Sequence, residues 1–258
     1  MVKPPRLLII AASDSSGGAG IQADIKTACA FGVYAMTAVT AVTAQDTVAV
    51  RSVYQMPASI VRDQIACCLA DIGADAIKIG MLGNGDIAAA VADALEGMDI
   101  PLVLDTVLLS SSGTPLLDAA GIDILKQRLI PRATLVTPNL PEAEALTGIM
   151  PDSEHRLRNA AMAFKLLSAE NVLFKGGHGE GNTVRDVLWS GGAFIAFEAP
   201  RQHTRHTHGT GCTLATAIAC GLAQKRSLND AVARAHAYVQ EAMRNAPGLG
   251  SGNGPLGH

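Results

Sequence analysis

The sequence predicts an α/β fold in which a mostly parallel sheet lies between two layers of helices. Short apolar runs typical of buried strands alternate with helical runs from residue 7 to residue 244. Consecutive parallel strands need crossover connections, and helices supply them while covering both faces of the sheet. Hydrophobic residues form 48% of the 258 residues, which provides a core for one large domain. Together these observations favour a three-layer αβα architecture.

The first half of the chain consists of strand–helix units. Its predicted strands are apolar or rich in Val and Thr, and they cover residues 7–12, 33–44, 76–79 and 101–105. Its predicted helices carry apolar side chains at helical spacing, and they cover residues 21–31, 59–72, 87–95 and 116–129. In the second of these helices, the stripe expected to face the core is Ile60, Ile65, Leu69 and Ile72.

The second half continues this pattern and adds one hairpin. Further strands are predicted over 134–137 and 172–175, and further helices from Glu142 onward and over 157–167, 214–224 and 228–244. Residues 184–189 and 193–197 flank Ser190-Gly191-Gly192, which predicts a hairpin at an edge of the sheet. Residues 248–257 are rich in glycine and predict a loop. Because no linker or repeat divides the chain, we expect a single domain over 1–258.

The composition argues against several classes of protein. The net charge is −3 and no dense basic run is present, which argues against nucleic acid as the main partner. No apolar run is long enough to span a membrane, and no signal peptide leads the chain. The five cysteines are odd in number and unevenly spaced, as is typical of free thiols in a reducing cytosol. We therefore expect a cytoplasmic protein.

Gly209-Thr210-Gly211-Cys212 is the segment that points most directly to chemistry. It precedes an Ala-rich helical run, so its backbone N–H groups are free at a helix start, where the helix dipole favours a phosphate. Cys212 falls in the first turn, where a thiol loses its proton more easily, and it is a candidate base or nucleophile. The alternative interpretation is a glycine-rich loop followed by a buried cysteine that acts as a small hydrophobic residue.

A second glycine-rich turn, Gly17-Gly18-Ala19-Gly20, follows the first predicted strand. It matches neither the dinucleotide fingerprint nor the P-loop, because no Lys-Ser or Lys-Thr follows it. Its glycines allow a small ligand to lie close to the backbone. Asp24, one turn into the next helix, is placed to reach back over this turn, or else it is a carboxylate favoured by the helix N-terminus.

Gln45 ends the second predicted strand and is a candidate for reading a ring. A carboxamide offers one acceptor and two donors, so it can pair with an amino group and an adjacent ring nitrogen, as Gln does with adenine. The alternative is a capping or solvent-facing glutamine.

Oxygen ligands follow two other predicted strands. Asp105 ends one of them, and Asn139 and Glu142 follow another, so these groups can hold Mg²⁺ through water molecules. Magnesium bound in this way usually carries nucleotide phosphates. The alternative is that Asn139 caps a helix and Glu142 completes a capping box, and both roles are compatible.

Lys175 and a group of histidines complete the polar segments. Lys175 ends a predicted strand before two glycines and can neutralise a phosphate, although a lysine at a strand end is often only solvated. His203, His206 and His208 alternate before the Gly-Thr-Gly turn, but no fourth ligand suggests zinc. In open α/β sheets, ligands bind outside the carboxyl ends of the strands, where all of these candidate residues are expected to lie.

The motifs taken together resemble the hydroxymethylpyrimidine/phosphomethylpyrimidine kinases of thiamine biosynthesis, which belong to the ribokinase-like superfamily. They include Asn139-Leu140-Pro141-Glu142 and Gly209-Thr210-Gly211-Cys212, and the full set covers residues 16–24, 78–82, 105–107, 137–143, 175–178 and 207–213. The resemblance runs along nearly the whole chain. It implies a ribokinase-like αβα fold, Mg²⁺ and ATP as the phosphate donor, and two successive phosphorylations, first of a hydroxymethyl group and then of the resulting phosphate ester.

The resemblance also implies roles for particular residues. It makes Gln45 the reader of the pyrimidine amino edge, and it makes Asp24, Ala19, Met81 and Val107 the wall and support of the pocket. Asn139 and Glu142 correspond to the family's metal–phosphate motif, with Asp105 nearby. Lys175 and His208 are expected near the nucleotide, and residues 209–212 form the anion hole. Cys212 stands where many ribokinase-like enzymes have the aspartate that serves as base.

Two alternatives to this function remain. Some relatives phosphorylate pyridoxal, and Gln45 favours an aminopyrimidine without excluding that ring. A non-catalytic ligand-binding protein that keeps the fold is a further alternative, although it leaves the metal and anion-hole residues without a role. The resemblance also implies a homodimer, because related kinases often form dimers.

Overall fold

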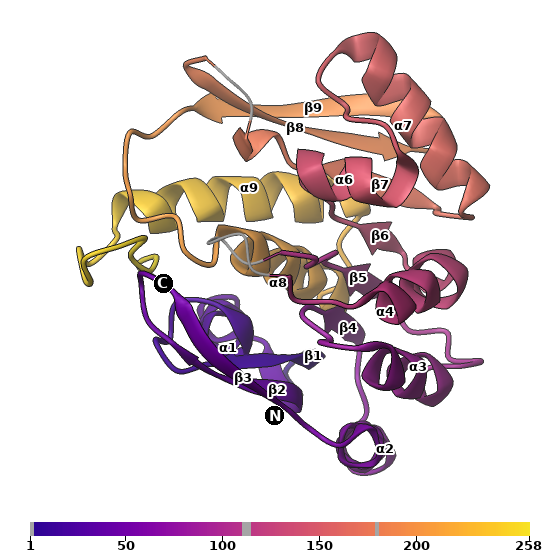
Figure 1. The fold of residues 1–258 in the computed structure, drawn as a ribbon. Coiled ribbons are helices and arrows are strands. Elements are labelled where there is room, and N and C mark those ends of the chain that lie inside the picture. The colour runs from indigo at the N-terminus through magenta and orange to yellow at the C-terminus, as the bar shows by residue number, and fades with distance from the viewer. Residues whose placement is uncertain (1–2, 110–114, 179–180) are drawn as a thin grey trace.

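The structure is a computed structural model that describes residues 3–109, 115–178 and 181–258 (Figure 1). Its strands join one nine-stranded sheet in the order β3-β2-β1-β4-β5-β6-β7-β8-β9. The strands are β1 Arg6–Asp14, β2 Tyr34–Gln45, β3 Val50–Gln55, β4 Ala76–Ile79, β5 Leu102–Leu104, β6 Leu135–Val136, β7 Asn171–Phe174, β8 Thr183–Ser190 and β9 Ala193–Pro200. The six strands from β2 to β7 in this order are parallel, whereas β3, β8 and β9 are antiparallel to their neighbours.

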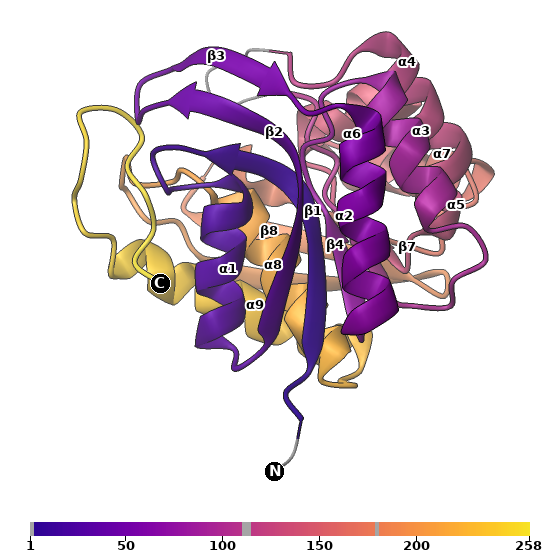
Figure 2. The same cartoon turned by 90° about the horizontal axis from the view of Figure 1, so that it is seen from below.

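Helices cover both faces of the sheet, as Figure 2 shows for α1 and α2 on opposite sides of β1. Those that form the layers are α1 Gly20–Ala30, α2 Ala58–Asp71, α3 Gly85–Ala94, α4 Ala119–Ile124, α5 Ile130–Arg132, α6 Leu140–Thr147, α7 Glu154–Leu166, α8 Thr210–Ala223 and α9 Leu228–Arg244. One apolar core joins α1, α8 and α9 to one face of the sheet. A second core joins the helices from α2 through α7 to the other face. The expected three-layer αβα fold is therefore confirmed.

The sheet faces explain why these strands form. Alternate residues of β1 enter different cores: Leu8 and Ile10 join one, and Leu7 and Ile9 join the other. A strand buried on both faces reads as a continuous apolar run, which is how the sequence identified it. The predicted hairpin is also present, because β8 and β9 pair across the turn at Gly191 and lie at one edge of the sheet.

Three expectations about the elements need correction. β3 was not predicted, and it forms the other edge of the sheet. The helix predicted over 116–129 is divided into α4, a π-helical turn over Leu125–Leu129, and α5. Pro131 explains the wide turn, because proline has no N–H to donate to the preceding turn. In α2 the buried side chains are Val61 and Ile65, whereas Ile60 and Ile72 are 43% and 37% exposed.

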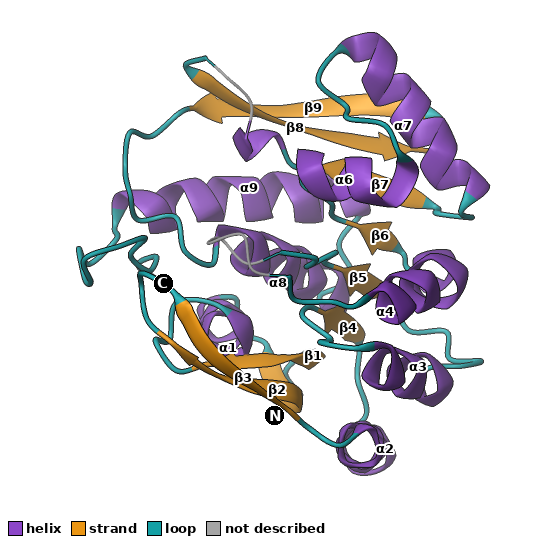
Figure 3. Cartoon of the chain, viewed as in Figure 1, coloured by secondary structure: helices purple, strands orange, loops and turns teal. Residues whose placement is uncertain are grey.

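The chain after α9 is loop, as expected, and Figure 3 draws it in the loop colour. It is nevertheless fixed to the fold, because Leu256 is buried and the carbonyl of Gly254 accepts a hydrogen bond from the His208 N–H at 3.1 Å. None of the helices in the described ranges has the length and apolar character needed to cross a membrane.

Candidate active site

The carboxyl ends of the parallel strands open into a pocket of about 350 Å³. Every site residue predicted from the sequence lines this pocket, with the exception of Asp24. Those that line it are Ala19, Gln45, Met81, Asp105, Val107, Asn139, Glu142, Lys175, His208, Gly209, Thr210, Gly211 and Cys212. Residues from the beginning and the end of the chain therefore meet at this edge of the sheet.

Asp24 lies beneath the pocket and not in its wall, which corrects the expectation of direct pocket contact. Its carboxylate is 0% exposed, because α1 turns this side chain into the protein interior. Oδ2 accepts a hydrogen bond from Lys78 Nζ at 2.8 Å, and Oδ1 accepts one from Thr216 Oγ1 at 2.6 Å. Burial raises the pKa of Asp24, and the charge of Lys78 opposes that rise. Asp24 therefore supports Lys78, which borders the pocket.

The turn before α8 forms an anion-binding end of the pocket. Gly209 has a φ of 86°, and a Cβ there would lie 1.9 Å from the carbonyl oxygen of Gly18, so glycine is required. The N–H groups of Gly211 and Cys212 have no hydrogen-bond partner among the residues that the structure describes. Free N–H groups at the start of a helix, together with the helix dipole, suit a phosphate.

Cys212 is half-buried beside this turn, and its thiol is less acidic than the sequence suggested. Burial raises the pKa of Cys212 to about 11, although Lys78 lowers it, and the carboxylates of Asp24 and Asp105 add to the rise. The expectation of an easily ionised thiol is therefore wrong for the protein without ligands. The helix terminus is a local effect, and it is outweighed by loss of water around the sulfur.

Lys175, Asp105 and Glu142 form a charged cluster in the pocket wall. Lys175 Nζ lies 2.7 Å from Asp105 Oδ1 and 3.8 Å from Glu142 Oε2. Thr137 Oγ1 also donates to Asp105 Oδ1, at 3.2 Å. Burial alone would raise the pKa of Asp105, but the neighbouring charge of Lys175 outweighs it and the pKa is lowered. Asp105 and Lys175 are therefore both charged in the resting protein.

Asn139 and Glu142 make the capping box that the sequence offered as one of two roles. Asn139 Oδ1 accepts from the Glu142 N–H, and Glu142 Oε2 accepts from the Asn139 N–H, both at 2.8 Å. Thr106 Oγ1 donates to the same carboxylate oxygen at 3.0 Å. Burial raises the pKa of Glu142 in spite of the nearby Lys175. The cap fixes both side chains at the start of α6, where they border the pocket.

Asp105 and Glu142 are the carboxylates expected to hold Mg²⁺ through water. Within the described ranges, Asp105 Oδ2 and Glu142 Oε1 each lack a hydrogen-bond donor. No group of three or more His, Cys, Asp or Glu side chains in the described part of the chain is arranged to hold a metal ion by itself. These oxygen atoms fit a magnesium ion that takes its other ligands from water and phosphates.

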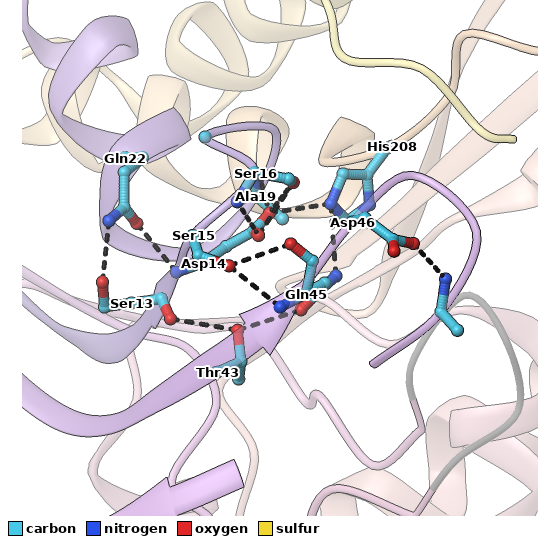
Figure 4. A network of polar contacts seen from close by, with 12 residues as sticks. Ser13, Asp14, Ser15, Ser16, Ala19, Gln22, Thr43, Gln45, Asp46 and His208 are labelled. Carbon is cyan, nitrogen blue, oxygen red and sulfur yellow. Dashed lines mark hydrogen bonds and ion pairs between the residues drawn. The ribbon is translucent and has the colours of Figure 1, made fainter. Parts of the chain in front are cut away.

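Gln45 lies at another part of the pocket, in the polar network of Figure 4. Its Nε2 is 3.3 Å from His208 Nε2, which is in turn 2.8 Å from Asp14 Oδ2. Its Oε1 is 3.2 Å from Thr43 Oγ1. Figure 4 shows Asp14, Gln45 and His208 pointing toward one another from three separate segments. The contacts of His208 therefore join it to the candidate ring-reading residue, whereas it was expected near the nucleotide.

Sequence reasoning missed Lys78 and Asp14. Lys78 stands inside the four-residue strand β4 and is 0% exposed. A lysine is almost never fully buried unless it is paired, so its place in an apolar run was a signal that a carboxylate lies opposite. Asp14 ends the buried strand β1, just as Asp105 follows β5, and the same reasoning about strand ends applies to it.

Comparisons with known proteins identify the family of the chain. A sequence model of the family described as phosphomethylpyrimidine kinase matches residues 14–257. The hydroxymethylpyrimidine/phosphomethylpyrimidine kinase of Streptomyces coelicolor is 45% identical over 257 residues, which cover 100% of this chain and 95% of that protein. The thiamine biosynthesis bifunctional protein ThiED of Geobacter sulfurreducens is also 45% identical, over 98% of this chain and 52% of its own length.

Solved structures show the same fold. The pyridoxal kinase of Bacillus subtilis, in an ADP complex, superposes with a TM-score of 0.91 at 32% identity, covering 99% of this chain and 98% of that one. The phosphomethylpyrimidine kinase of Clostridium difficile superposes with a TM-score of 0.81 at 37% identity, covering 93% of this chain and 99% of that one. The ribokinase-like fold is thereby confirmed. On the sequence match and these identities, the chain belongs to the phosphomethylpyrimidine kinase family.

Proposed function

We propose that this kinase uses ATP to phosphorylate 4-amino-5-hydroxymethyl-2-methylpyrimidine and then phosphorylates the monophosphate to the diphosphate, as a step of thiamine biosynthesis. One observation carries the proposal: the turn before α8, whose Gly211 and Cys212 N–H groups have no partner among the described residues, borders the same pocket as the carboxamide of Gln45. The turn suits the phosphate in transfer, and the carboxamide suits an aminopyrimidine ring. The names of the relatives in Streptomyces coelicolor and Bacillus subtilis support this substrate.

The donor side of the reaction is assigned to the charged cluster. Lys175 binds a phosphate of ATP, since its side chain borders the pocket and keeps 13% of its surface exposed. Asp105 and Glu142 hold Mg²⁺ through water, and Asn139 keeps Glu142 in place through the capping box. Bound Mg²⁺ supplies positive charge to the nucleotide phosphates. Phosphoryl transfer depends chiefly on such positioning and charge.

The acceptor side is assigned to residues 209–212. In the first phosphorylation, the oxygen of the hydroxymethyl group bonds to the γ-phosphorus of ATP, and the bond from that phosphorus to the leaving oxygen of ADP breaks. The hydroxyl proton passes to Cys212 in its thiolate form, which is a small fraction of the enzyme near neutral pH because burial raises the pKa of the thiol to about 11. The N–H groups of Gly211 and Cys212 hold the oxygens of the phosphoryl group in transfer. Ala19, Met81 and Val107 form the wall around the ring.

The second phosphorylation needs less from Cys212. Its acceptor is a phosphate oxygen that is already largely ionised near neutral pH, so no proton has to be removed. The monophosphate acceptor adds a negative group to the pocket, and two lysines, Lys78 and Lys175, border that pocket. Lys78 carries positive charge because Asp24 outweighs the effect of burial and raises its pKa.

Pyridoxal phosphorylation is the second candidate function. The observation in its favour is structural, because pyridoxal kinases from Bacillus subtilis and Staphylococcus aureus both superpose with TM-scores of 0.91. A binding protein without catalysis is a weaker alternative, since it leaves Lys175, Glu142 and Cys212 without a purpose.

Product identity tests the proposal. The protein is incubated with ATP, Mg²⁺ and the hydroxymethylpyrimidine, and the products are followed by ³¹P NMR and mass spectrometry, with pyridoxal in a parallel reaction. We expect the monophosphate and then the diphosphate, at a higher kcat/KM than for pyridoxal. A higher kcat/KM for pyridoxal would reassign the main substrate, and no transfer to either acceptor would contradict the kinase assignment.

The remaining expectations concern organisation. We infer that residues 1–258 act as one domain, that the enzyme works in the cytoplasm on small molecules, and that it is a homodimer with no nucleic-acid or membrane partner. The single continuous sheet supports the first inference. Sedimentation velocity at several concentrations tests the dimer, and a monomer at all concentrations would contradict it.

A further inference from the structure

In the network around Gln45, two hydrogen-bond donors face each other, the Nε2 atoms of His208 and Gln45. His208 Nε2 lies 2.8 Å from a carboxylate oxygen of Asp14 and 3.3 Å from Gln45 Nε2 (Figure 4). An ionised carboxylate only accepts hydrogen bonds, so the close contact with Asp14 requires a hydrogen on His208 Nε2. An amide nitrogen only donates. A nitrogen of Gln45 therefore cannot be the group that His208 Nε2 meets.

Asp14 is held in its ionised form by its other neighbours. Its carboxylate accepts from the Ser16 N–H at 2.8 Å, the Ala19 N–H at 2.9 Å and the Ser16 hydroxyl. Burial opposes ionisation, but the hydrogen bonds from His208 and Ser16 outweigh it, and the pKa of Asp14 is lowered. No proton of Asp14 is then available to reverse the direction of the bond to His208.

Thr43 is compatible with this orientation at the other end of the amide. Thr43 Oγ1 has one hydrogen and two partners within reach, the Ser13 carbonyl at 3.1 Å and the amide of Gln45 at 3.2 Å. When that hydrogen is donated to Ser13, the hydroxyl can accept from the amide nitrogen of Gln45. The two ends of a carboxamide have the same shape, and hydrogen-bond partners decide which is which. His208 favours the amide oxygen on its own side, which places the nitrogen toward Thr43, where the hydroxyl can accept.

The backbone of Gln45 is fixed as well. Its N–H donates to Ser15 Oγ and its carbonyl accepts from the same hydroxyl, both at 2.9 Å. The amide is located between His208 and Thr43, and in that place a rotation about its last bond exchanges oxygen and nitrogen. We propose that Asp14 and His208 are positioning residues that set this rotation and thereby determine which hydrogen-bonding pattern Gln45 presents to the ring of the acceptor.

The pattern discriminates between two classes of pyrimidine. Gln45 presents an acceptor on the His208 side and a donor on the Thr43 side. A 4-aminopyrimidine offers the complement, an amino donor beside a ring-nitrogen acceptor. A 4-oxopyrimidine offers a carbonyl acceptor beside a ring N–H, so in the same orientation it places like groups together. This inference rests on the proposed function in one respect, namely that Gln45 contacts the ring.

The first test measures the hydrogen on His208 without any substrate. Imidazole ¹⁵N NMR of the whole protein separates protonated from unprotonated ring nitrogens, and loss of a signal in the His208→Gln variant assigns the resonances. We expect a hydrogen on Nε2 of His208. A hydrogen on Nδ1 together with a bare Nε2 would overturn the proposal, whether or not the protein phosphorylates a pyrimidine.

The second test compares the 4-aminopyrimidine with its 4-oxo analogue. In Asp14→Asn, the new amide can donate to His208 Nε2, which moves the ring hydrogen to Nδ1 and lets Gln45 turn over. We expect the ratio of kcat/KM for the amino over the oxo acceptor to fall about ten-fold to a hundred-fold, with the KM for ATP little changed. Asp46→Asn is the matched control, because Asp46 bonds Arg51 and the Ala49 N–H and does not contact the amide of Gln45.

Two variants of His208 keep the test valid if Asp14→Asn does not fold. His208→Gln keeps an N–H that can reach Asp14, so it should preserve the amino-over-oxo ratio. His208→Leu removes the donor and should lower the ratio about ten-fold or more. Equal ratios in the parent, His208→Gln and His208→Leu would overturn the proposal. If the parent uses neither pyrimidine, the proposed function fails, and the NMR result still decides the orientation.

Discussion

Lys78 and Lys175 both pair with an aspartate near the pocket, yet the two pairs have different surroundings. Lys78 and Asp24 are 2.8 Å apart and both side chains are 0% exposed. Lys175 and Asp105 are 2.7 Å apart, but Lys175 keeps 13% of its side chain exposed and has Glu142 as a second acidic neighbour. Both side chains of the first pair are fully buried and Asp24 lies beneath the pocket, so this pair stays together although Lys78 borders the pocket. The second pair can exchange a partner when a phosphate or a metal ion enters.

The Lys78–Asp24 pair is therefore expected to stabilise the fold beneath the site. The charges of Lys175, Asp105 and Glu142 are expected to change partners when a ligand binds. A buried ion pair is costly to break, because the remaining charge has no water to replace its partner. When a partly exposed pair such as Lys175–Asp105 is broken, water or a ligand can solvate the remaining charge. The same change should therefore have different effects in the two pairs.

The largest effect is expected when the buried pair loses its carboxylate. Asp24→Ala leaves the charge of Lys78 buried without compensation, and we expect a loss of about 3–5 kcal/mol in the free energy of unfolding. Denaturant unfolding followed by circular dichroism measures it. Asp105→Ala is the matched variant and should cost less, because Lys175 keeps Glu142 and access to the pocket. Equal losses would show that the two pairs do not differ in kind.

The second effect concerns turnover and belongs to the cluster of Lys175, Asp105 and Glu142 in the pocket wall. Glu142→Gln removes a negative charge but keeps an oxygen for the hydrogen bonds from Asn139 and Thr106, so the fold should be preserved. We expect kcat to fall about 10²–10³-fold, the usual range when one electrostatic group is lost from an active site. Glu144→Gln, on an exposed position of the same helix, serves as the control. Full activity in Glu142→Gln would remove this carboxylate from the site.

A smaller effect compares the threonines that bond the two aspartates. Thr216 donates to Asp24 at 2.6 Å, and Thr137 donates to Asp105 at 3.2 Å. Thr216→Val should lower the free energy of unfolding by about 1.5–3 kcal/mol, since the bond is to a buried charge. Thr137→Val should cost less, because the longer bond leaves Asp105 still paired with Lys175. Thermal unfolding of both variants checks the order, and the reverse order would contradict it.

The last effect is a pH dependence. Burial raises the pKa of Cys212 to about 11, so the thiol keeps its proton between pH 7 and pH 9. If Cys212 accepts the hydroxyl proton, the reactive thiolate fraction rises by up to about ten-fold per pH unit, and kcat for the first phosphorylation should rise with it. The profile of Cys212→Asp should be flat there, because a carboxylate is already ionised. A flat profile in the parent enzyme would show that Cys212 shapes the anion hole without acting as the base.

The fold was largely predictable because its signals are local. Buried parallel strands read as apolar runs, and the order of strands and helices follows from them. The strand β3 escaped because nearly all of its side chains are exposed, so it has no apolar periodicity to detect. The π-helical turn before Pro131 escaped because helical spacing predicts a helix but not the width of one of its turns.

The sequence predicted which residues line the pocket better than it predicted their burial and acidity. Polar residues at strand ends identified Gln45, Asp105 and Lys175, all of which border the pocket. Asp24 was misplaced because its partner Lys78 is 54 residues away, and only the folded chain brings them together. The acidity of Cys212 was misjudged for a similar reason. The helix start is visible in the sequence, whereas the loss of water around the thiol depends on packing.

The distance along the chain between partners in the site also bears on how the protein is made. Asp14 meets His208 across 194 residues, and Asp24 meets Thr216 across 192. Synthesis proceeds from the N-terminus, so β1 and α1 emerge long before α8 exists. Contacts so far apart in sequence form slowly, because the long intervening chain must be ordered first. The nascent polypeptide therefore carries Asp24 and Lys78 without their cover until α8 emerges from the ribosome.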